Sequence, residues 1–184
     1  MFNNLDGNDI SSYNVNIEKL REEVQQFFRD KRMVFQSNGP EETRMLGQLL
    51  GESSRPGQVY TLTGDLGVGK TLFTQGFAAG LGISEPVSSP TFTIMQVYDT
   101  GRLPFYHFDV YRISDVDEME EVGWEDYIYG DGVCMVEWAE LIREILPESR
   151  FRVRIEKDLE KGFDYRRITL ENIEAGIRPH AIER

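Results

Sequence analysis

A glycine-rich segment in the first half of the chain carries the residue types that phosphate chemistry needs. It fits the pattern G-x-x-x-x-G-K-[ST] at every fixed position, and its residues are Gly64, Asp65, Leu66, Gly67, Val68, Gly69, Lys70 and Thr71. The glycines permit positive φ angles and let backbone N–H groups close around phosphate oxygens. Lys70 can reach the outer phosphates of a nucleotide, and the Thr71 hydroxyl can ligate Mg²⁺. The spacing therefore predicts a phosphate loop that binds a magnesium nucleotide.

The elements expected on either side of this loop support the same prediction. Residues 58–63 are rich in apolar, β-branched and aromatic types and predict a strand, whereas residues 70–81 predict a helix. A helix that begins near Lys70 directs the positive end of its dipole at the same anion. The fixed positions alone match by chance in about one chain of this length in a hundred. The flanking elements make an accidental Gly-rich turn rarer still.

Two acidic residues at the ends of expected strands are candidates to place the metal. Proteins with such a loop use an acidic residue at the end of a neighbouring buried strand to orient Mg²⁺ and its waters. Glu137 follows the apolar residues 133–136, and Asp109 follows the aromatic-rich residues 105–108. Each is also explained as a surface acid at a strand end, but a phosphate loop needs at least one of them. Which of the two dominates stays open.

Motifs that the sequence lacks limit which nucleotide the protein is expected to bind and which reaction it is expected to catalyse. GTPases carry a guanine-reading N-K-x-D segment, and the sequence contains none, so ATP is the expected nucleotide. A kinase for small molecules usually carries a basic lid and a pocket for its acceptor. The best basic cluster alternates along one expected strand, as Arg150, Arg152 and Arg154. A period of two puts these side chains on one face of a sheet, where a solvated surface explains them better than a lid.

Length, charge and cysteine content restrict the class of protein further. A chain of 184 residues suits one domain. Its 20 basic and 32 acidic residues give a net charge of -12, so any RNA is expected to be held by a partner. The single cysteine, Cys134, excludes an intrachain disulfide. No apolar run reaches the roughly 20 residues that span a bilayer and the first residues lack an apolar signal core, so a cytoplasmic setting is expected.

The expected elements alternate between strands and helices, with one hairpin. Strands are expected at 32–36, 58–63, 93–98, 104–110, 133–136, 150–156 and 166–171, and helices at 17–31, from Pro40, at 70–81, within 115–126 and at 139–145. This order predicts an α/β fold, a P-loop NTPase-like three-layer domain with a mixed parallel/antiparallel central sheet. We divide the chain into a polar arm plus amphipathic helix (1–31), a P-loop ATPase domain (32–172) and a C-terminal tail (173–184). The apolar stripe of the first helix favours packing on the domain over partner binding.

Several segments together resemble one family. Residues 64–71, 89–93, 107–112 and 137–138 occur in the order and spacing of the TsaE family, and the similarity spans residues 32–172. The resemblance implies a cytoplasmic ATPase of bacterial tRNA threonylcarbamoyladenosine synthesis that works with TsaD and TsaB. Those partners would install threonylcarbamoyl on the adenosine beside the anticodon, and ATP turnover would reset their complex between rounds. It also implies that tRNA is reached only through the complex, with no role for DNA or a membrane.

The resemblance also assigns roles to the loop and the two acids. It implies that residues 66–71 contact the phosphates of ATP and that Thr71 and Glu137 are the Mg²⁺ ligands. Lys70, Asp109 and Glu137 would form the catalytic set. In that set Asp109 would orient the attacking water.

Further roles follow for residues that flank the acids. By the same resemblance, Thr91 lies in a switch-like loop that senses the γ-phosphate, although the Ser-Pro pair before it is also ordinary turn chemistry. Tyr111, Arg112 and Trp138 are candidates to face the partner. A plain surface role is the alternative for the first two, and a core role is the alternative for Trp138. His107 is interpreted as a packed strand residue.

Two other functions stay open on the residues alone. A small-molecule P-loop kinase shares the loop, and its ATP consumption would depend strictly on an added metabolite. A nucleotide-dependent binding module would hydrolyse ATP slowly, and no partner would change that rate. Both differ from a TsaE-like ATPase subunit in whether a metabolite or a partner protein changes the rate of ATP consumption.

Overall fold

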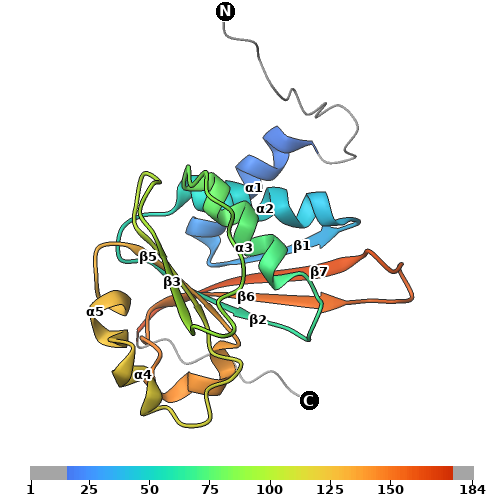
Figure 1. Cartoon of the computed structure of the whole chain (residues 1–184). Helices are drawn as coiled ribbons and strands as arrows, with labels where there is room; N and C mark the ends of the chain where they lie inside the picture. The colour runs from blue at the N-terminus through green and yellow to red at the C-terminus, as the bar shows by residue number, and fades with distance from the viewer. Residues whose placement is uncertain (1–15, 176–184) are drawn as a thin grey trace, which may run out of the picture.

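A seven-stranded sheet organises residues 16–175, the part of the chain that the computed structural model describes (Figure 1). Its strands lie in the order β1-β7-β6-β2-β5-β4-β3. Their bounds are Arg32–Ser37 (β1), Val59–Thr63 (β2), Met95–Tyr98 (β3), Phe105–Asp109 (β4), Val133–Glu137 (β5), Arg150–Lys157 (β6) and Arg166–Ile173 (β7). Every strand expected from the sequence is present.

The sheet is parallel at its centre and antiparallel at both edges. β2 pairs in parallel with β5 and β6, and β4 pairs in parallel with β5. β7 runs antiparallel to both β6 and β1, and β3 runs antiparallel to β4. The predicted mixed sheet is therefore confirmed. Because parallel strands end at the same edge, the residues that follow β2, β4 and β5 meet there.

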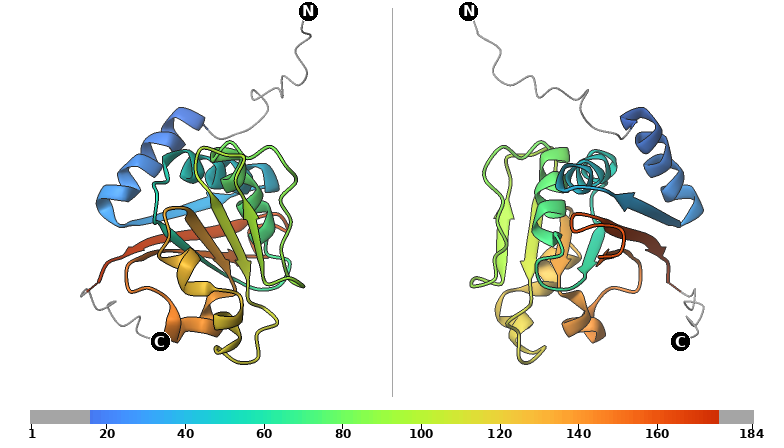
Figure 2. Two further views of the ribbon diagram at one scale, coloured as in Figure 1. Left: turned by 60° about the vertical axis from the view of Figure 1, so that its left-hand side comes forward. Right: turned by 90° about the vertical axis from the view of Figure 1, so that its right-hand side faces the viewer.

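Helices α1 (Ile17–Asp30), α2 (Pro40–Ser53) and α3 (Lys70–Gly80) cover one face of the sheet (Figure 2). Phe77 of α3 is fully buried and packs edge-on against Tyr60 of β2, with ring centroids 4.8 Å apart. α2 lies so close behind α3 that a Cβ on its Gly47 would stand 2.3 Å from a backbone carbonyl oxygen of α3. These contacts fix α3, and with it the helix N-terminus that follows the phosphate loop.

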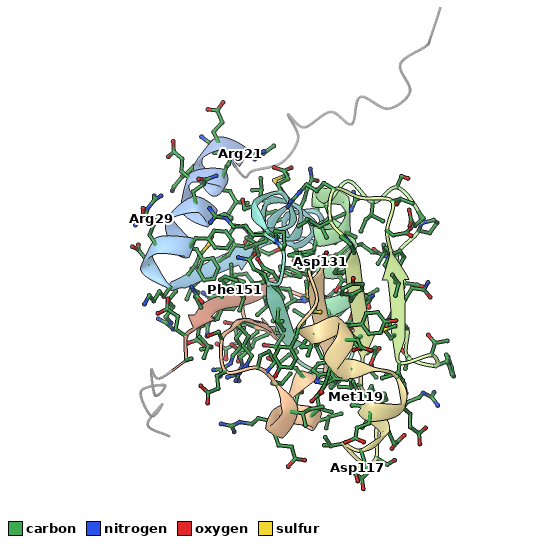
Figure 3. All side chains as sticks on the ribbon, turned by 90° about the vertical axis from the view of Figure 1, so that its left-hand side faces the viewer. Arg21, Arg29, Asp117, Met119, Asp131 and Phe151 are labelled. Atoms are coloured by element: carbon green, nitrogen blue, oxygen red, sulfur yellow. The ribbon has the colours of Figure 1, made fainter. Side chains whose placement is uncertain are left out.

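Shorter helices cover the opposite face of the sheet over β4 and β5. They are α4 (Glu118–Glu121), α5 (Trp124–Ile128) and the 3-10 helix η2 (Ala139–Ile145). Met119 is buried under this layer, whereas Asp117, just before α4, lies at the outer edge of the molecule (Figure 3). Helices on both faces make three layers, as the sequence predicts.

Residues 139–145 form 3-10 turns rather than a regular α-helix. Trp138, which precedes them, has φ 60, and its carbonyl accepts a hydrogen bond from the Leu141 N–H at 3.0 Å. Ile142 leaves helical geometry with φ -120 while its side chain stays fully buried. The chain turns tightly after β5 and returns an apolar side chain to the core at once, and a regular helix does not fit that path.

The first helix packs on the domain. Leu20, Val24 and Phe27 of α1 are buried, and the Phe27 ring lies 5.9 Å from the Phe151 ring of β6. The outer side of α1 is polar and carries Arg21 and Arg29 (Figure 3). Packing of this helix on the domain is confirmed, while the boundaries after residues 31 and 172 stay predictions. The expected arm and most of the tail fall on 1–15 and 176–184, outside the described residues, and none of the helices within 16–175 is long and apolar enough to cross a membrane.

β3 begins later than the sequence predicts. The amides of Thr93 and Ile94 both donate to the Pro90 carbonyl, at 3.1 and 2.7 Å, and Ile94 has φ 65. These residues therefore form a turn instead of the start of a strand. The expected hairpin is still confirmed, because β3 pairs antiparallel with β4 from Met95 onward.

Candidate functional site

The phosphate loop connects the end of β2 to the start of α3. Gly64 has φ 142, and a Cβ there would stand 2.4 Å from the Ile155 carbonyl oxygen of β6, so glycine alone fits this close approach. Gly69, just before α3, has φ 111. No side chain within residues 16–175 caps the N-terminus of α3, so the backbone N–H groups of its first turn stay available to an anion.

A cleft of about 450 Å³ opens beside this loop. Its lining includes most of the predicted site residues, namely Leu66, Gly67, Gly69, Lys70, Thr71, Thr91, Asp109, Tyr111, Glu137 and Trp138. Gly64, Asp65, Val68 and Arg112 are not part of the lining. The structure thus brings the loop, both acids and Thr91 together, and it sets Arg112 apart from them.

Lys70 lines the cleft, and its charge is held by the loop itself. Its Nζ donates to the carbonyl oxygens of Gly64 and Asp65, at 2.7 and 3.1 Å. The same ammonium lies 3.6 Å from the centroid of the Trp138 ring, a favourable cation–π distance. Burial lowers the pKa of Lys70, and the charge of Glu137 acts in the opposite direction. In this structure two loop carbonyls and the Trp138 ring thus hold the Lys70 ammonium beside the loop residues that line the cleft.

The two predicted acids lie side by side at the end of adjacent strands. Asp109 of β4 is the register partner of Glu137 of β5. Their exposures are 3% and 2%, so two carboxylates are withdrawn from water next to each other. Such a pair needs nearby positive charge. Lys70 supplies one charge, and a divalent cation at the cleft would supply more.

Glu137 is held by two side chains that the sequence did not mark as partners. His107 Nε2 lies 2.9 Å from Glu137 Oε1, and the Thr74 hydroxyl donates to the same oxygen at 3.4 Å. His107 is fully buried, and its Nδ1 has no hydrogen-bond partner among the described residues. A neutral ring that carries its proton on Nε2 fits this contact, because that nitrogen can then donate to the carboxylate. Burial of His107 is confirmed, and it also orients the acid.

A sequence signal for this contact does exist. Residues at i and i+2 of a strand share one face, so His107 lies on the same face of β4 as Asp109. Thr74 lies one helical turn after Lys70 and is fully buried under the sheet. The spacing suffices to place each residue on the face that carries the site, but it does not reveal which side chains touch Glu137.

Asp109 ties a loop to the floor of the cleft. Its Oδ2 accepts hydrogen bonds from the hydroxyls of Ser89 and, at 2.8 Å, Thr91. Its Oδ1 accepts from the Tyr111 backbone N–H at 3.0 Å. Thr91 is therefore more than part of a turn, since its hydroxyl reaches an acid of the site. Its predicted role toward the γ-phosphate stays a prediction.

The three residues predicted to face a partner belong to two stacked pairs of side chains. Tyr111, 49% exposed, packs against the half-buried Trp138 with ring centroids 4.8 Å apart. The Arg112 guanidinium lies 4.4 Å from the centroid of the Phe92 ring, which is 83% exposed. Trp138 thus belongs to the cleft through Lys70, whereas Arg112 and Phe92 form an outer pair. Partner contact by these residues stays a prediction.

The oxygen donors of the cleft suit Mg²⁺ bound together with phosphates. Within residues 16–175, no group of three or more His, Cys, Asp or Glu side chains forms a metal site of its own. Mg²⁺ keeps several waters and is usually held by one or two carboxylates plus substrate phosphates. The Thr71 hydroxyl with Glu137 and Asp109 offers that kind of incomplete shell.

A phosphate loop between the central parallel strand and a helix, with acids at the ends of the adjoining strands, defines a P-loop NTPase-like α/β protein. Comparison with known families agrees with this class. The model for "Threonylcarbamoyl adenosine biosynthesis protein TsaE" matches residues 37–168. The chain therefore belongs to the TsaE family, and the resemblance of its motifs is confirmed.

Individual relatives support the same assignment. The tRNA threonylcarbamoyladenosine biosynthesis protein TsaE of Bacillus subtilis is 50% identical over 139 residues, 76% of this chain and 85% of the relative. The protein of the same name from Treponema pallidum is 43% identical over 112 residues, 61% of this chain and 82% of the relative. The crystal structure of Bacillus subtilis YdiB superposes with a TM-score of 0.66 at 44% identity, covering 78% of this chain and 87% of that one.

Proposed function

We propose that this chain binds and hydrolyses Mg-ATP as a subunit of tRNA N6-threonylcarbamoyladenosine synthesis in the cytoplasm. The observation that carries the proposal is the convergence on one cleft of Lys70 and Thr71 with two buried acids, Asp109 and Glu137. The reaction is ATP plus water to ADP plus phosphate. Family membership supports the pathway, and the geometry of the cleft supports the nucleotide.

The loop, the two acids and the side chains that hold these acids have proposed tasks in that reaction. The loop amides and the Lys70 ammonium would hold the β- and γ-phosphates, while Thr71 and Glu137 would hold Mg²⁺. Bound Mg²⁺ supplies positive charge that offsets the charge of the transferring phosphoryl group. Asp109 would orient the attacking water, and its bonds to Ser89 and Thr91 keep that carboxylate in a fixed position. His107 and Thr74 would keep the Glu137 carboxylate in one orientation.

ATP is proposed as the preferred nucleotide because no guanine-reading N-K-x-D segment is present in the sequence. Labelled ATP bound to the chain should be displaced by unlabelled ATP at a much lower concentration than by unlabelled GTP. Equal displacement by both nucleotides would refute the preference.

The partner is proposed to be a TsaD–TsaB complex that holds the tRNA. The names of the relatives refer to tRNA threonylcarbamoyladenosine biosynthesis. A net charge of -12 makes independent capture of a polyanion unfavourable. The isolated chain is then expected to hydrolyse ATP weakly, and the complex is expected to stimulate it. In this scheme ATP hydrolysis resets the complex after each round of modification.

The test measures modified tRNA per TsaD–TsaB complex, with wild-type chain and with Lys70→Ala. Wild type with ATP should convert a limited yield into multiple turnovers, and Lys70→Ala should not. Multiple turnovers with both proteins would show that ATP use here is not the reset step. ATP consumption that requires an added metabolite would favour a kinase, and slow hydrolysis that no partner changes would favour a binding module.

A further inference from the structure

The hairpin of β6 and β7 contacts the phosphate loop from the side away from the acids. β6 borders β2 on one side, whereas β5 borders it on the other. The hairpin extends along the edge of the molecule where the loop from β2 to α3 also lies (Figure 1). Arg166, the first residue of β7, donates from its Nε to the Val68 carbonyl oxygen at 2.7 Å. This bond links the hairpin to the backbone of the phosphate loop.

The direction of the Val68 carbonyl decides the direction of the next amide. A trans peptide unit is planar, and its C=O and N–H point to opposite sides; the chain contains no cis peptide among its described residues. When Arg166 draws the Val68 oxygen toward the hairpin, the Gly69 N–H must point away from the hairpin. Gly69 lines the cleft. We propose that Arg166 is a positioning residue that holds the Val68–Gly69 peptide with its N–H toward the phosphates.

The contacts of Arg166 make it suited to hold one peptide orientation. Its Nη1 donates to the carbonyl oxygens of Phe163 and Tyr165, each at 2.8 Å. The guanidinium is planar and rigid, so these bonds set the direction of the Nε bond to the loop. The Val68 side chain is 1% exposed and is held in the core. The peptide that follows Val68 is thus fixed by the buried side chain and by the carbonyl bond.

The conformation of Gly69 explains why such a clamp is needed. With φ 111, Gly69 has no Cβ to restrict the rotation of the peptide before it. A flipped peptide would present the Val68 carbonyl oxygen to the phosphates and would repel them. Arg166 bonds to the carbonyl only in the orientation that leaves the N–H free for the anion. Lys157, whose Nζ lies 4.0 Å from where a Cβ of Gly67 would stand, adds positive charge on the same side.

The inference rests on the proposed nucleotide site, and the test separates the two. Equilibrium affinities for ATP and ADP are measured for wild type, Arg166→Ala, Arg166→Lys and Arg152→Ala, each at a temperature where circular dichroism shows it folded. Arg152 is the matched control, since it is a half-buried arginine of the same hairpin that bonds Glu171 instead of the loop. A second readout is the amide NMR signal of Gly69 on addition of ADP.

Arg166→Ala should lower the affinity for both ATP and ADP by about tenfold or more, the loss expected for a charge-assisted hydrogen bond. Arg166→Lys, which retains a cationic donor, should recover part of that affinity, and Arg152→Ala should bind as wild type does. ADP should shift the Gly69 amide signal in wild type but much less in Arg166→Ala. If Arg166→Ala binds as tightly as Arg152→Ala with an unchanged Gly69 shift, the inference is overturned while the nucleotide site stands. A wild-type chain that binds no ATP overturns the site itself, and this inference with it.

Discussion

The two sides of the phosphate loop are built on opposite principles. On the β4–β5 side, Asp109 and Glu137 are only 3% and 2% exposed, and each is held by hydroxyl, imidazole or backbone amide groups. On the β6–β7 side, Arg166 is half-buried and Lys157 is exposed, and the bond to the loop goes to its backbone. The β4–β5 side thus places two acids where we propose that Mg²⁺ and the attacking water bind. The β6–β7 side sets the direction of the Val68–Gly69 peptide.

This difference follows from the topology of the sheet. β5 and β4 are parallel to β2, so their carboxyl ends deliver short acidic side chains to the edge where the loop begins. β7 is antiparallel to β6 and begins at this edge, so its first residue, Arg166, must reach back toward the loop with a long side chain. Losses on the β4–β5 side should therefore appear mainly in hydrolysis, and losses at the loop mainly in nucleotide affinity.

The largest expected effect is on hydrolysis and comes from the acid side. Glu137→Ala should lower the rate constant for ATP hydrolysis by about 100-fold or more, because a misplaced metal loses several kcal/mol of transition-state stabilisation. ATP affinity should change far less. Phosphate release and equilibrium binding measure the two quantities. Glu144→Ala, which removes an exposed acid of the 139–145 segment, is the matched control and should behave as wild type.

Normal ATP hydrolysis by both Glu137→Ala and Asp109→Ala would contradict the proposed role of the β4–β5 side in hydrolysis, because the buried acids would then have no chemical task. A loss of ATP affinity as large as the loss of rate would also contradict it, since the acid side would then serve binding.

The next effect is on affinity and comes from the loop itself. Lys70→Ala should weaken Mg-ATP binding about ten- to hundredfold, the value of a charge-assisted contact of roughly 1.5–3 kcal/mol. Titration of the folded variant with ATP measures it. Lys161→Ala removes an exposed lysine of the β6–β7 hairpin and should leave the affinity unchanged. Wild-type affinity in a folded Lys70→Ala protein would refute the phosphate loop.

A smaller effect should follow from the loop that Asp109 holds. Thr91→Val removes a hydroxyl that bonds Asp109 at 2.8 Å and keeps the shape of the side chain. Hydrolysis should slow about three- to tenfold. A hydrogen bond to a charged group is worth roughly 1.5–3 kcal/mol, but Asp109 keeps its bonds from Ser89 and from the Tyr111 N–H, so only part of that value is lost. Thr93→Val, an exposed threonine of the same loop, is the control. Equal rates for both variants would leave Thr91 as turn chemistry only.

The central part of this site was predictable because it is local in the sequence. The segment 64–71 carries its own spacing, and an apolar run followed by one acid predicts Glu137 at the end of a buried strand. β-strand and helix periodicity likewise predicted the individual elements, and their order with one hairpin predicted the α/β class and the mixed sheet. The loop, Glu137 and each element are signalled by residues that lie close together in the sequence.

The parts that were missed depend on contacts between distant segments. His107 and Glu137 are 30 residues apart, and Arg166 and Val68 are 98 apart. No periodicity reports which strands become neighbours, so the partners of Glu137 and the bond from β7 required the structure. The late start of β3 was missed for another reason. Ile94 has strand propensity, but with φ 65 it completes the turn that carries Thr91 to Asp109, and tertiary context overrides its propensity.

The smallest expected effect on the isolated chain comes from Arg112, which belongs neither to the acid side nor to the hairpin side of the phosphate loop. Arg112 stacks on the exposed Phe92 ring and does not line the cleft, so Arg112→Ala should change ATP affinity by less than about twofold, as surface substitutions usually do. The stimulation of ATP hydrolysis by a TsaD–TsaB complex should be weaker in Arg112→Ala than in wild type, because exposed arginine and aromatic side chains are the types that anchor interfaces. The rate of ATP hydrolysis is measured at increasing concentrations of the TsaD–TsaB complex. Arg143→Ala, which removes another exposed arginine, is the control. Equal stimulation of both variants would place the partner elsewhere and leave the outer pair as plain surface, whereas a loss of ATP affinity in Arg112→Ala would extend the binding side beyond the cleft.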